Sequence, residues 1–186
     1  VGEGAKRSVL NAVASLGSNL VVVMKSWERR PVNDAPPRGF TLEEAEAVRA
    51  LPHIAYAVIE NPVTMTVQAE GEAGSTLVTA TEVDFPFVHD WPVTSGMFFD
   101  DADARGHAPV VVIGTKVADR FFRDRDPIGR VLTIGNGSFH IVGVMAAKGA
   151  SPGGIDLDDT VFLPYSTYVV RVGGDREAKF LMAKTR

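Results

Sequence analysis

Residues 110–144, VVVIGTKVADRFFRDRDPIGRVLTIGNGSFHIVGV, carry a close succession of strand, helix and turn signals. The β-branched run at 110–113 is too short for a helix and predicts a strand over residues 109–113. Gly114 follows as a turn, and Thr115 is expected to be the N-cap of a short helix that ends at Phe122. The chain therefore changes from strand to helix within a few residues.

The remainder of this stretch predicts a turn and a hairpin. Residues 126–129, Asp-Pro-Ile-Gly, are typical of a turn, because proline fixes φ and glycine accepts a positive φ. Strands are expected over residues 131–134 and 138–145, and Asn136-Gly137 between them is a strong hairpin signal. This part of the chain therefore predicts antiparallel pairing.

Outside this stretch, helices and strands are mixed along the chain. Residues 41–51 are the clearest helix, because Thr41 and Glu44 have the spacing of a capping box. The other expected elements are a helix over 4–16, a strand over 19–25, a proline-rich linker over 27–39, strands over 54–69 and 76–82 joined by a loop at 70–74, a strand over 160–163, a helix over 168–172 and a final strand over 179–184. Hairpins dominate the second half, which favours an α+β fold over a doubly wound parallel sheet.

The composition excludes several classes of protein. The chain has 186 residues, 45% of them hydrophobic, which is enough for a packed core. Its formal net charge of −4 argues against a nucleic-acid partner, because nucleic-acid-binding surfaces are usually basic. The absence of cysteine excludes disulfides and thiolate metal sites. No apolar run approaches the roughly 20 residues that span a bilayer.

No motif indicates a bound nucleotide or metal ion. Gly114-Thr115-Lys116 follows a strand, but Pro109 stands where a phosphate loop needs its first glycine. The acidic clusters at 100–103 and 156–159 lack the spacing of a calcium loop and are expected to be solvated loops or helix caps. The histidines, scattered singly, are His53, His89, His107 and His140. We therefore expect no cofactor and no metal site.

No serine lies in the Gly-x-Ser-x-Gly pattern of a hydrolase nucleophile. The serines close to a glycine are Ser18, Ser95, Ser138 and Ser151. A catalytic triad assembled by the fold stays an open alternative, because triads are recognised by geometry rather than by order in the chain. The main expectation is that the chain has no catalytic residues.

Taken in order, these segments resemble the periplasmic core domain of MacB-like ABC-transporter permeases, within the FtsX-like permease superfamily. The segments that carry the resemblance are residues 2–5, 15–19, 41–45, 110–143 and 159–164. Gly96 with Phe98-Phe99 is similar to the family's signature of glycine, basic residue and aromatic residue, although Met97 stands where a basic residue is usual.

The resemblance implies two lobes and a mechanical function. Residues 1–84 and 175–186 would form a porter-like α/β lobe, which here stops after one final strand, and residues 85–174 would form an inserted β-rich, Sabre-like lobe. The domain would lie on the periplasmic side of the inner membrane and couple ATP hydrolysis to export or substrate extraction. The implied partners are a cytoplasmic ATP-binding subunit or domain, a periplasmic adaptor, a second copy of the permease, and the membrane through helices outside this chain.

Aromatic residues gather in segment 84–99, which is expected to be packed but irregular. If exposed, Phe85, Phe87 and Trp91 would form a surface for a partner or cargo. The alternative is ordinary core, because aromatic side chains are mostly buried. Two other functions stay open for the whole chain. A stand-alone small-molecule binding module predicts a closed apolar pocket, and a hydrolase predicts a serine or histidine beside an acid in a cleft.

Overall fold

The computed structural model describes residues 13–15, 19–23, 25 and 39–186. The strands are β1 (Val13–Ser15), β2 (Leu20–Val23), β3 (Ile54–Ala69), β4 (Glu72–Thr81), β5 (Val93–Gly96), β6 (Val110–Ile113), β7 (Val131–Ile134), β8 (Gly137–Met145), β9 (Thr160–Pro164) and β10 (Phe180–Thr185). The helices are α2 (Leu42–Arg49), α3 (Phe85–Val88), α4 (Asp101–Arg105), α5 (Thr115–Phe122) and α6 (Tyr165–Thr167), which continues into the π-helix η1 (Tyr168–Val172). Within these ranges no helix has the length and hydropathy needed to cross a membrane.

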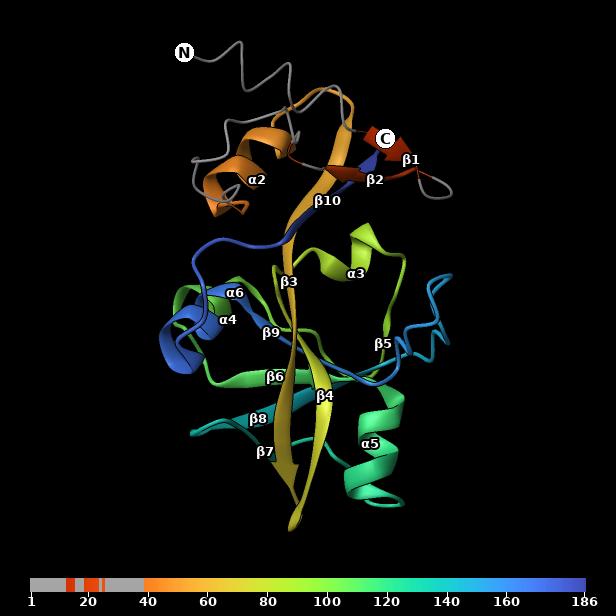
Figure 1. Ribbon diagram of the computed structural model, residues 1–186, viewed down its shortest axis with the longest axis vertical. Coiled ribbons are helices and arrows are strands. Elements are labelled where there is room, and N and C mark those ends of the chain that lie inside the picture. The colour runs from red at the N-terminus through yellow and green to blue at the C-terminus, as the bar shows by residue number, and fades with distance from the viewer. Residues whose placement is uncertain (1–12, 16–18, 24, 26–38) are drawn as a thin grey trace, which may run out of the picture.

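The strands form one mixed sheet. Their order is β1-β2-β10-β3-β4-β9-β6-β8-β5, and β7 pairs with both β3 and β8. The pairs β4–β9 and β6–β8 are parallel, whereas the hairpins β3–β4 and β7–β8 are antiparallel. Helices lie beside the sheet rather than alternating regularly with its strands, so the α+β prediction is confirmed (Figure 1).

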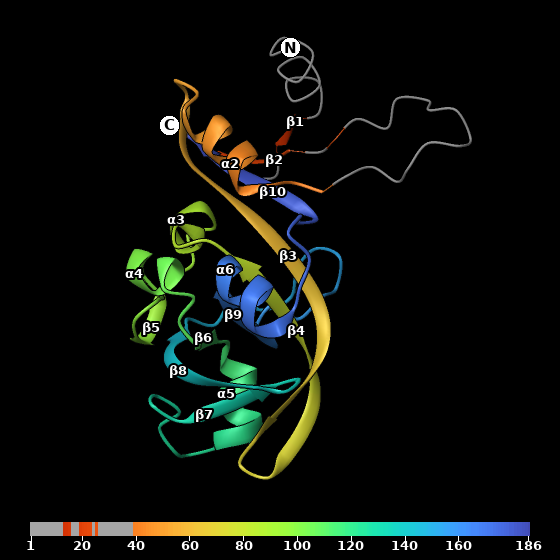
Figure 2. The same ribbon diagram turned by 90° about the vertical axis from the view of Figure 1, so that its left-hand side faces the viewer.

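Strand β3 runs along most of the length of the molecule (Figures 1 and 2). Its first part pairs with β10, as in Ile59↔Leu181, and its second part pairs with β4, beginning at Asn61↔Ala80. We call β1, β2, β10, residues 54–60 of β3 and the helix α2 the upper sheet. The remaining described elements, from the second part of β3 to η1, are the lower body. The C-terminus lies at the end of the molecule formed by the upper sheet.

Helix α2 forms as its sequence predicts. The Glu44 N–H donates to Thr41 Oγ1 at 3.3 Å, and the Thr41 N–H donates to Glu44 Oε2 at 3.0 Å, so both bonds of the capping box are present. Ala45 and Val48 form the buried face of the helix, which packs on β3 and β10. A local capping signal and a short apolar face thus suffice to place this helix.

The β3–β4 hairpin is tighter than the expected loop at 70–74. Pairing continues to Ala69↔Glu72, so only Glu70 and Gly71 form the turn. Their φ angles are 52° and 79°, which is the pattern of a type I′ turn. This turn matches the twist of the strands and lets both continue to the lower tip of the molecule.

The stretch 110–144 folds into the predicted strand, helix and hairpin, with two one-residue corrections. Gly114, not Thr115, is the N-cap of α5, and the Lys116 N–H in the first turn donates to the Asp158 carbonyl oxygen at 3.2 Å. The same oxygen lies 2.2 Å from where a Cβ at residue 114 would stand, so this position requires glycine. The hairpin turn is Gly135-Asn136 rather than Asn136-Gly137, because Ile134 pairs with Gly137 and Gly135 has a φ of 57°. The first shift involves the distant residue Asp158, whereas the second is set within the hairpin itself.

The predicted helix over 4–16 is wrong at its end. Val13–Ser15 is the strand β1, which pairs antiparallel with β2 through Val13↔Val23 and Ser15↔Val21. Hydrogen bonding along the sheet outweighs the helical spacing here, because a strand propensity depends strongly on its partner. Residues 4–12 of this prediction, and residues 27–38 of the predicted linker, lie outside the described residues.

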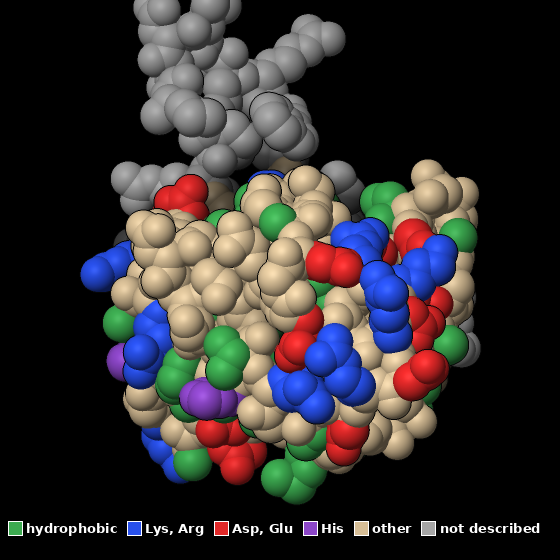
Figure 3. Space-filling view, turned by 90° about the horizontal axis from the view of Figure 1, so that it is seen from below, with side chains coloured by type: hydrophobic (Ala, Val, Ile, Leu, Met, Phe, Trp, Pro, Cys, Tyr) green, Lys and Arg blue, Asp and Glu red, His purple; other side chains and the backbone are tan. Residues whose placement is uncertain are grey.

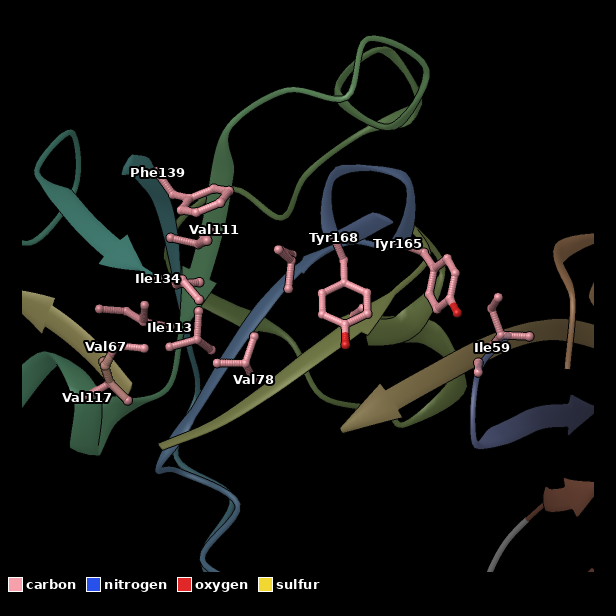
Figure 4. Packing of buried hydrophobic residues seen from close by; sticks show 14 of the residues in the cluster. Ile59, Val67, Val78, Val111, Ile113, Val117, Ile134, Phe139, Tyr165 and Tyr168 are labelled. Atoms are coloured by element: carbon pink, nitrogen blue, oxygen red, sulfur yellow. The ribbon is translucent and has the colours of Figure 1, made fainter. Parts of the chain in front are cut away.

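One hydrophobic cluster joins the upper sheet to the lower body. It extends from Val23 and Leu181 above to Phe122 and Phe139 below. Figure 4 shows Tyr165 and Tyr168, whose ring centroids are 6.1 Å apart, lying between the lower core and Ile59 of β3. Every buried side-chain nitrogen or oxygen in the described part of the chain has a hydrogen-bond partner. The two parts are therefore packed together and not merely tethered.

Candidate functional site

The structure separates the three aromatic residues that the sequence grouped as a partner surface. Phe85 and Trp91 are only 3% and 4% exposed, whereas Phe87 is 55% exposed. Phe85 begins the short helix α3, and Phe87 lies two residues later on its opposite side. Only Phe87 among them presents most of its side chain to solvent.

Phe85 and Trp91 belong to a second hydrophobic cluster, beneath α3. Their rings lie 4.7 Å and 5.4 Å from the ring centroid of Phe162 on β9. The indole Nε1–H of Trp91 donates to the Ala146 carbonyl oxygen at 2.6 Å. The expectation of an irregular segment 84–99 is wrong in part: the helix α3 and the strand β5, which pairs with β8, both lie in it, and the aromatic side chains pack beneath them.

Phe87 lines a shallow surface groove of about 490 Å³. Its ring stacks on Tyr56 of β3 with centroids 5.2 Å apart. At the groove's edge Lys184 of β10 donates through Nζ to the Phe87 carbonyl oxygen at 3.2 Å and pairs with the Asp90 carboxylate. The Lys184 ammonium group holds the pKa of Asp90 below its ordinary value. The groove thus lies between α3 and the upper sheet.

We call the region where β3 passes from the upper sheet to the lower body the junction. It comprises residues 56–62 of β3, Arg49 of α2, residues 81–91 and Lys184 of β10. On one side of β3, His89 pairs through Nε2 with Glu60, and the two side chains are 18% and 13% exposed. The His89 ring also packs on Phe85, 4.4 Å between centroids. Helix α3 is therefore tied to β3 and β10 by polar side chains.

Also at the junction, side chains occupy an edge of β3 where no strand pairs. Pairing with β4 ends at Asn61↔Ala80, so the backbone of Ile59 has no ladder partner there. The Ile59 N–H donates to Glu82 Oε2, and Thr81 Oγ1–H donates to the Ile59 carbonyl oxygen, both at 2.9 Å. These two side chains take the place of a neighbouring strand.

Arg49 of α2 also bonds to this edge of β3. Its Nε–H donates to the Ala57 carbonyl oxygen at 3.0 Å, and its Nη2 lies 2.9 Å from Glu82 Oε1. Burial raises the pKa of Glu82 above its ordinary value, and the Ile59 N–H and the Arg49 guanidinium oppose that rise. Burial raises the pKa of nearby Asp84 as well. We call Arg49, Thr81 and Glu82 the edge clip.

The lower tip of the molecule also carries ion pairs, but these are open to solvent. Arg123 pairs with Glu72 at 3.1 Å, and Arg125 pairs with Glu70 at 2.7 Å. Figure 3 shows side chains of both charges intermingled over this end. Such a surface has no strong excess of one charge and does not resemble an anion-binding site.

The acidic clusters have structural roles. Asp100 caps α4 and, with Asp103, forms a capping box. The buried carboxylate of Asp158 accepts hydrogen bonds from the N–H groups of Lys148 and Gly149, at 2.7 and 2.9 Å, and so holds the loop before β9. No group of three or more His, Asp or Glu residues that could hold a metal ion occurs among the residues with described positions.

The geometry offers little to the two alternative functions. In residues 39–186, the one close histidine–carboxylate pair is His89–Glu60, and both side chains serve to hold α3 on β3. Ser151 accepts a hydrogen bond from the Ile155 N–H in a loop, and Ser95 and Ser138 lie exposed on strands. The groove at Phe87 and a second groove of about 460 Å³ beside His107 are open to solvent, unlike the closed pocket of a small-molecule binding module.

Comparison with known proteins identifies the family. A family model described as "MacB-like periplasmic core domain" matches residues 1–186. The chain belongs to this family. As a MacB-like periplasmic core domain, it is part of a family of ABC-transporter permeases and is not itself a catalytic domain.

Curated relatives of this MacB-like domain are named for export. The chain is 36% identical, over all of its length, to a pyoverdine export ATP-binding/permease protein, PvdT, of Pseudomonas syringae pv. tomato. It is 34% identical, over 95% of its length, to a macrolide export ATP-binding/permease protein, MacB, of an Azoarcus species. The chain spans only 28% and 27% of these two proteins.

Solved structures show the same fold. The periplasmic region of MacB from Actinobacillus actinomycetemcomitans matches with a TM-score of 0.75 at 13% identity, over 95% of this chain and 77% of that one. The extracellular domain of the ABC-type transporter YknZ from Gram-positive bacteria matches with a TM-score of 0.70 at 17% identity, over 81% of this chain and 75% of that one. The predicted resemblance is therefore confirmed.

The sequence interpretation of this MacB-like domain missed the residues that build its junction. Arg49, Thr81 and Glu82 were assigned no role, because they are far apart in the chain and form no motif. One signal was available: Glu60 stands inside a long apolar strand and Glu82 directly follows another. A charged residue in such a position needs a partner, although the sequence does not name it.

Proposed function

We propose that the chain is the extracytoplasmic domain of an ABC export permease that passes movement, driven by ATP hydrolysis in the cytoplasm, to a periplasmic partner or cargo. The observation that carries this proposal is the family match over residues 1–186, together with the export ATP-binding/permease names of its relatives. The domain would lie on the periplasmic side of the inner membrane.

The packing of the described residues supports a mechanical role. A body that transmits displacement must be well packed, because close-packed interiors transmit strain. Strand β3 and a continuous hydrophobic cluster both extend from the upper sheet into the lower body. The division into a lobe of residues 1–84 plus 175–186 and a lobe of residues 85–174 stays a prediction. Strand β4 of the first lobe would then pair with β9 of the second.

The proposed partners are those of an export machine. ATP would be hydrolysed by a cytoplasmic ATP-binding subunit or domain, and helices outside this chain would anchor it in the membrane. A periplasmic adaptor and a second copy of the permease would complete the assembly. Of the three aromatic residues first considered as a docking surface, Phe87 supports that role best, because its ring is exposed beside an open groove.

Replacement of the domain tests the coupling function. In the full-length parent protein reconstituted into lipid vesicles, a flexible Gly/Ser linker in place of this chain is expected to leave ATP hydrolysis measurable and to abolish cargo export. Exchange for the corresponding segment of the 36% identical relative is the control, and it is expected to keep export. Wild-type export by the linker protein would overturn the proposal.

A single substitution tests docking at Phe87. Phe87→Ser is expected to reduce export while the thermal unfolding temperature of the domain stays close to wild type, because the side chain is largely exposed. Val170→Ser, at a residue that is 60% exposed beside the other groove, is the matched control. Equal export by the wild type and the Phe87 variant would remove this residue from the docking surface.

A further inference from the structure

The upper sheet and the lower body are joined by few segments. The chain passes between them within β3, near residues 60–61, and again through residues 173–179 before β10. At residues 57–59 β3 pairs with β10 along one edge, while its other edge faces the edge clip. Besides the hydrophobic cluster and the bonds of Lys184 to Phe87 and Asp90, the stiffness of this neck therefore depends on the side chains that cover the unpaired edge.

The edge clip covers that edge with groups from both parts of the molecule. Arg49 belongs to α2 of the upper sheet, whereas Thr81 and Glu82 stand at the end of β4 in the lower body. Arg49 bonds both to the β3 backbone at Ala57 and to Glu82. The same carboxylate accepts from the Ile59 N–H, so one continuous set of hydrogen bonds links α2, β3 and β4.

The surroundings of the clip differ from those of an ordinary surface ion pair. The side chains of Arg49 and Glu82 are 32% and 17% exposed, and each makes a second bond to the β3 backbone. A partly buried pair with fixed backbone partners has few alternative arrangements, so it selects one relative orientation of the elements that hold it. An exposed ion pair without backbone partners does not fix the orientation of the elements that hold it.

We propose that the edge clip locks the upper sheet to the lower body, so that the domain moves as one rigid lever. This inference rests on the proposed coupling function and adds the residues that make coupling effective. Without the clip, the neck at residues 57–59 keeps its pairing with β10, the hydrophobic cluster and the Lys184–Asp90 pair, but loses the hydrogen bonds along its other edge. Displacement applied at one end would then bend the neck instead of moving the other end.

The chain offers a clean test, because it contains no cysteine and cysteines introduced for spin labels are the sole attachment sites. Labels at the exposed positions Glu46 of α2 and Asp119 of α5 report the distance between the two parts by pulsed electron paramagnetic resonance. The wild type is expected to give one narrow distance distribution. Arg49→Met and Glu82→Gln are expected to broaden it at least twofold, whereas Glu72→Gln, which breaks an exposed pair, is not.

A second measurement keeps the inference testable if a variant is too unstable for labelling. Thr81→Val removes the hydrogen bond to the Ile59 carbonyl oxygen and so loosens the clip. It is expected to speed exchange of the Ile59 amide, whose N–H donates to Glu82, about tenfold, the effect of losing one hydrogen bond. Exchange in α5 is expected to stay unchanged. Unaltered distance distributions and exchange rates in folded clip variants would overturn the inference.

Export by the full-length parent protein separates this inference from the proposed function. Clip variants are expected to hydrolyse ATP at wild-type rates and to lose most of their export. A broadened distance distribution with wild-type export would refute the lever role of the clip and leave the coupling function standing. The coupling function itself is tested by the linker replacement described above, which removes the whole domain and not the clip residues alone.

Discussion

Arginine–glutamate pairs occur at both ends of the long hairpin β3–β4, yet they differ in what surrounds them. At the junction Arg49 and Glu82 are mostly buried and both bond to the β3 backbone. At the lower tip the Arg123 and Glu72 side chains are 73% and 47% exposed, and among the described residues these side chains hydrogen-bond only to each other. Backbone partners and burial, rather than charge, therefore distinguish an ion pair that fixes neighbouring elements from one that is merely solvated.

Truncation of Phe162, in the aromatic cluster beneath α3, should lower the stability of the domain most. Phe162 is buried between Phe85 and Trp91, so Phe162→Ala is expected to lower the free energy of unfolding by about 4 kcal/mol through lost contacts and a residual cavity. Urea unfolding measures this change. Phe87→Ala is the control and should cost less than about 1 kcal/mol, because that ring stays largely in water. Similar losses of stability in the Phe162 and Phe87 variants would refute the distinction between a buried and an exposed aromatic ring.

Removal of the cation from the edge clip should have the next largest effect. Arg49→Met leaves the Glu82 carboxylate without its ion pair and the Ala57 carbonyl oxygen without its donor. We expect a loss of about 2 kcal/mol in the free energy of unfolding, the range for a partly buried polar group left unpaired. Urea, which is uncharged, is the suitable denaturant. A loss no larger than that of an exposed pair would contradict the comparison.

The pH dependence of stability should reveal the burial of Glu82. Because burial raises its folded-state pKa above 4.5, the folded chain binds this proton more readily than the unfolded chain. The stabilisation by protonation is therefore complete below pH 4.5 and is lost as pH rises through the folded-state pKa. Glu82→Gln cannot titrate, so the stability of the wild type relative to this variant should fall over that window.

The measurement is a series of urea titrations of both proteins at increasing pH. Pairing with Arg49 opposes the pKa rise, so the pH-dependent change should be smaller than the loss caused by Arg49→Met. A difference in stability that rises with pH would mean that the ion pair outweighs burial. Glu72→Gln, at the lower tip, serves as the reference titration.

The exposed pair should show the smallest effect. Glu72→Gln removes the partner of Arg123 and is expected to change the free energy of unfolding by about 0.5 kcal/mol or less, because exposed pairs gain little and are screened by salt. The remaining difference should vanish at 1 M salt. If Glu72→Gln lowered the free energy of unfolding as much as Arg49→Met, burial and backbone partners would not distinguish the two ion pairs.

Some elements were predictable because their signals are local. The capping box of Thr41 and Glu44 places α2, and the hairpin signal at Asn136-Gly137 places β7 and β8 to within one residue. The errors occur where a distant group intervenes. Gly114 rather than Thr115 is the N-cap, and the Asp158 carbonyl oxygen accepts from the Lys116 N–H in the first turn of α5. The strand β1 forms because β2 pairs with it.

In the candidate site, too, local signals were predictable and the effects of distant residues were not. The sequence alone identified Phe85, Phe87 and Trp91 as a group, but which ring faces water depends on Phe162, far along the chain. The edge clip had no signal at all as a unit. Arg49 and Glu82 are 33 residues apart, and nothing in either neighbourhood indicates that they meet.

The sequence by itself determined the fold class, most of the helices and strands, and the family, because these follow from local propensity and from the order of many weak signals. Only the tertiary structure decided which side chains cover the unpaired edge of β3 and which aromatic ring stays in solvent. The physical reason is that burial and hydrogen bonding belong to pairs of groups. The partner of each group is chosen when β3, β4 and α2 pack together, and its identity is written nowhere in the group's own neighbourhood.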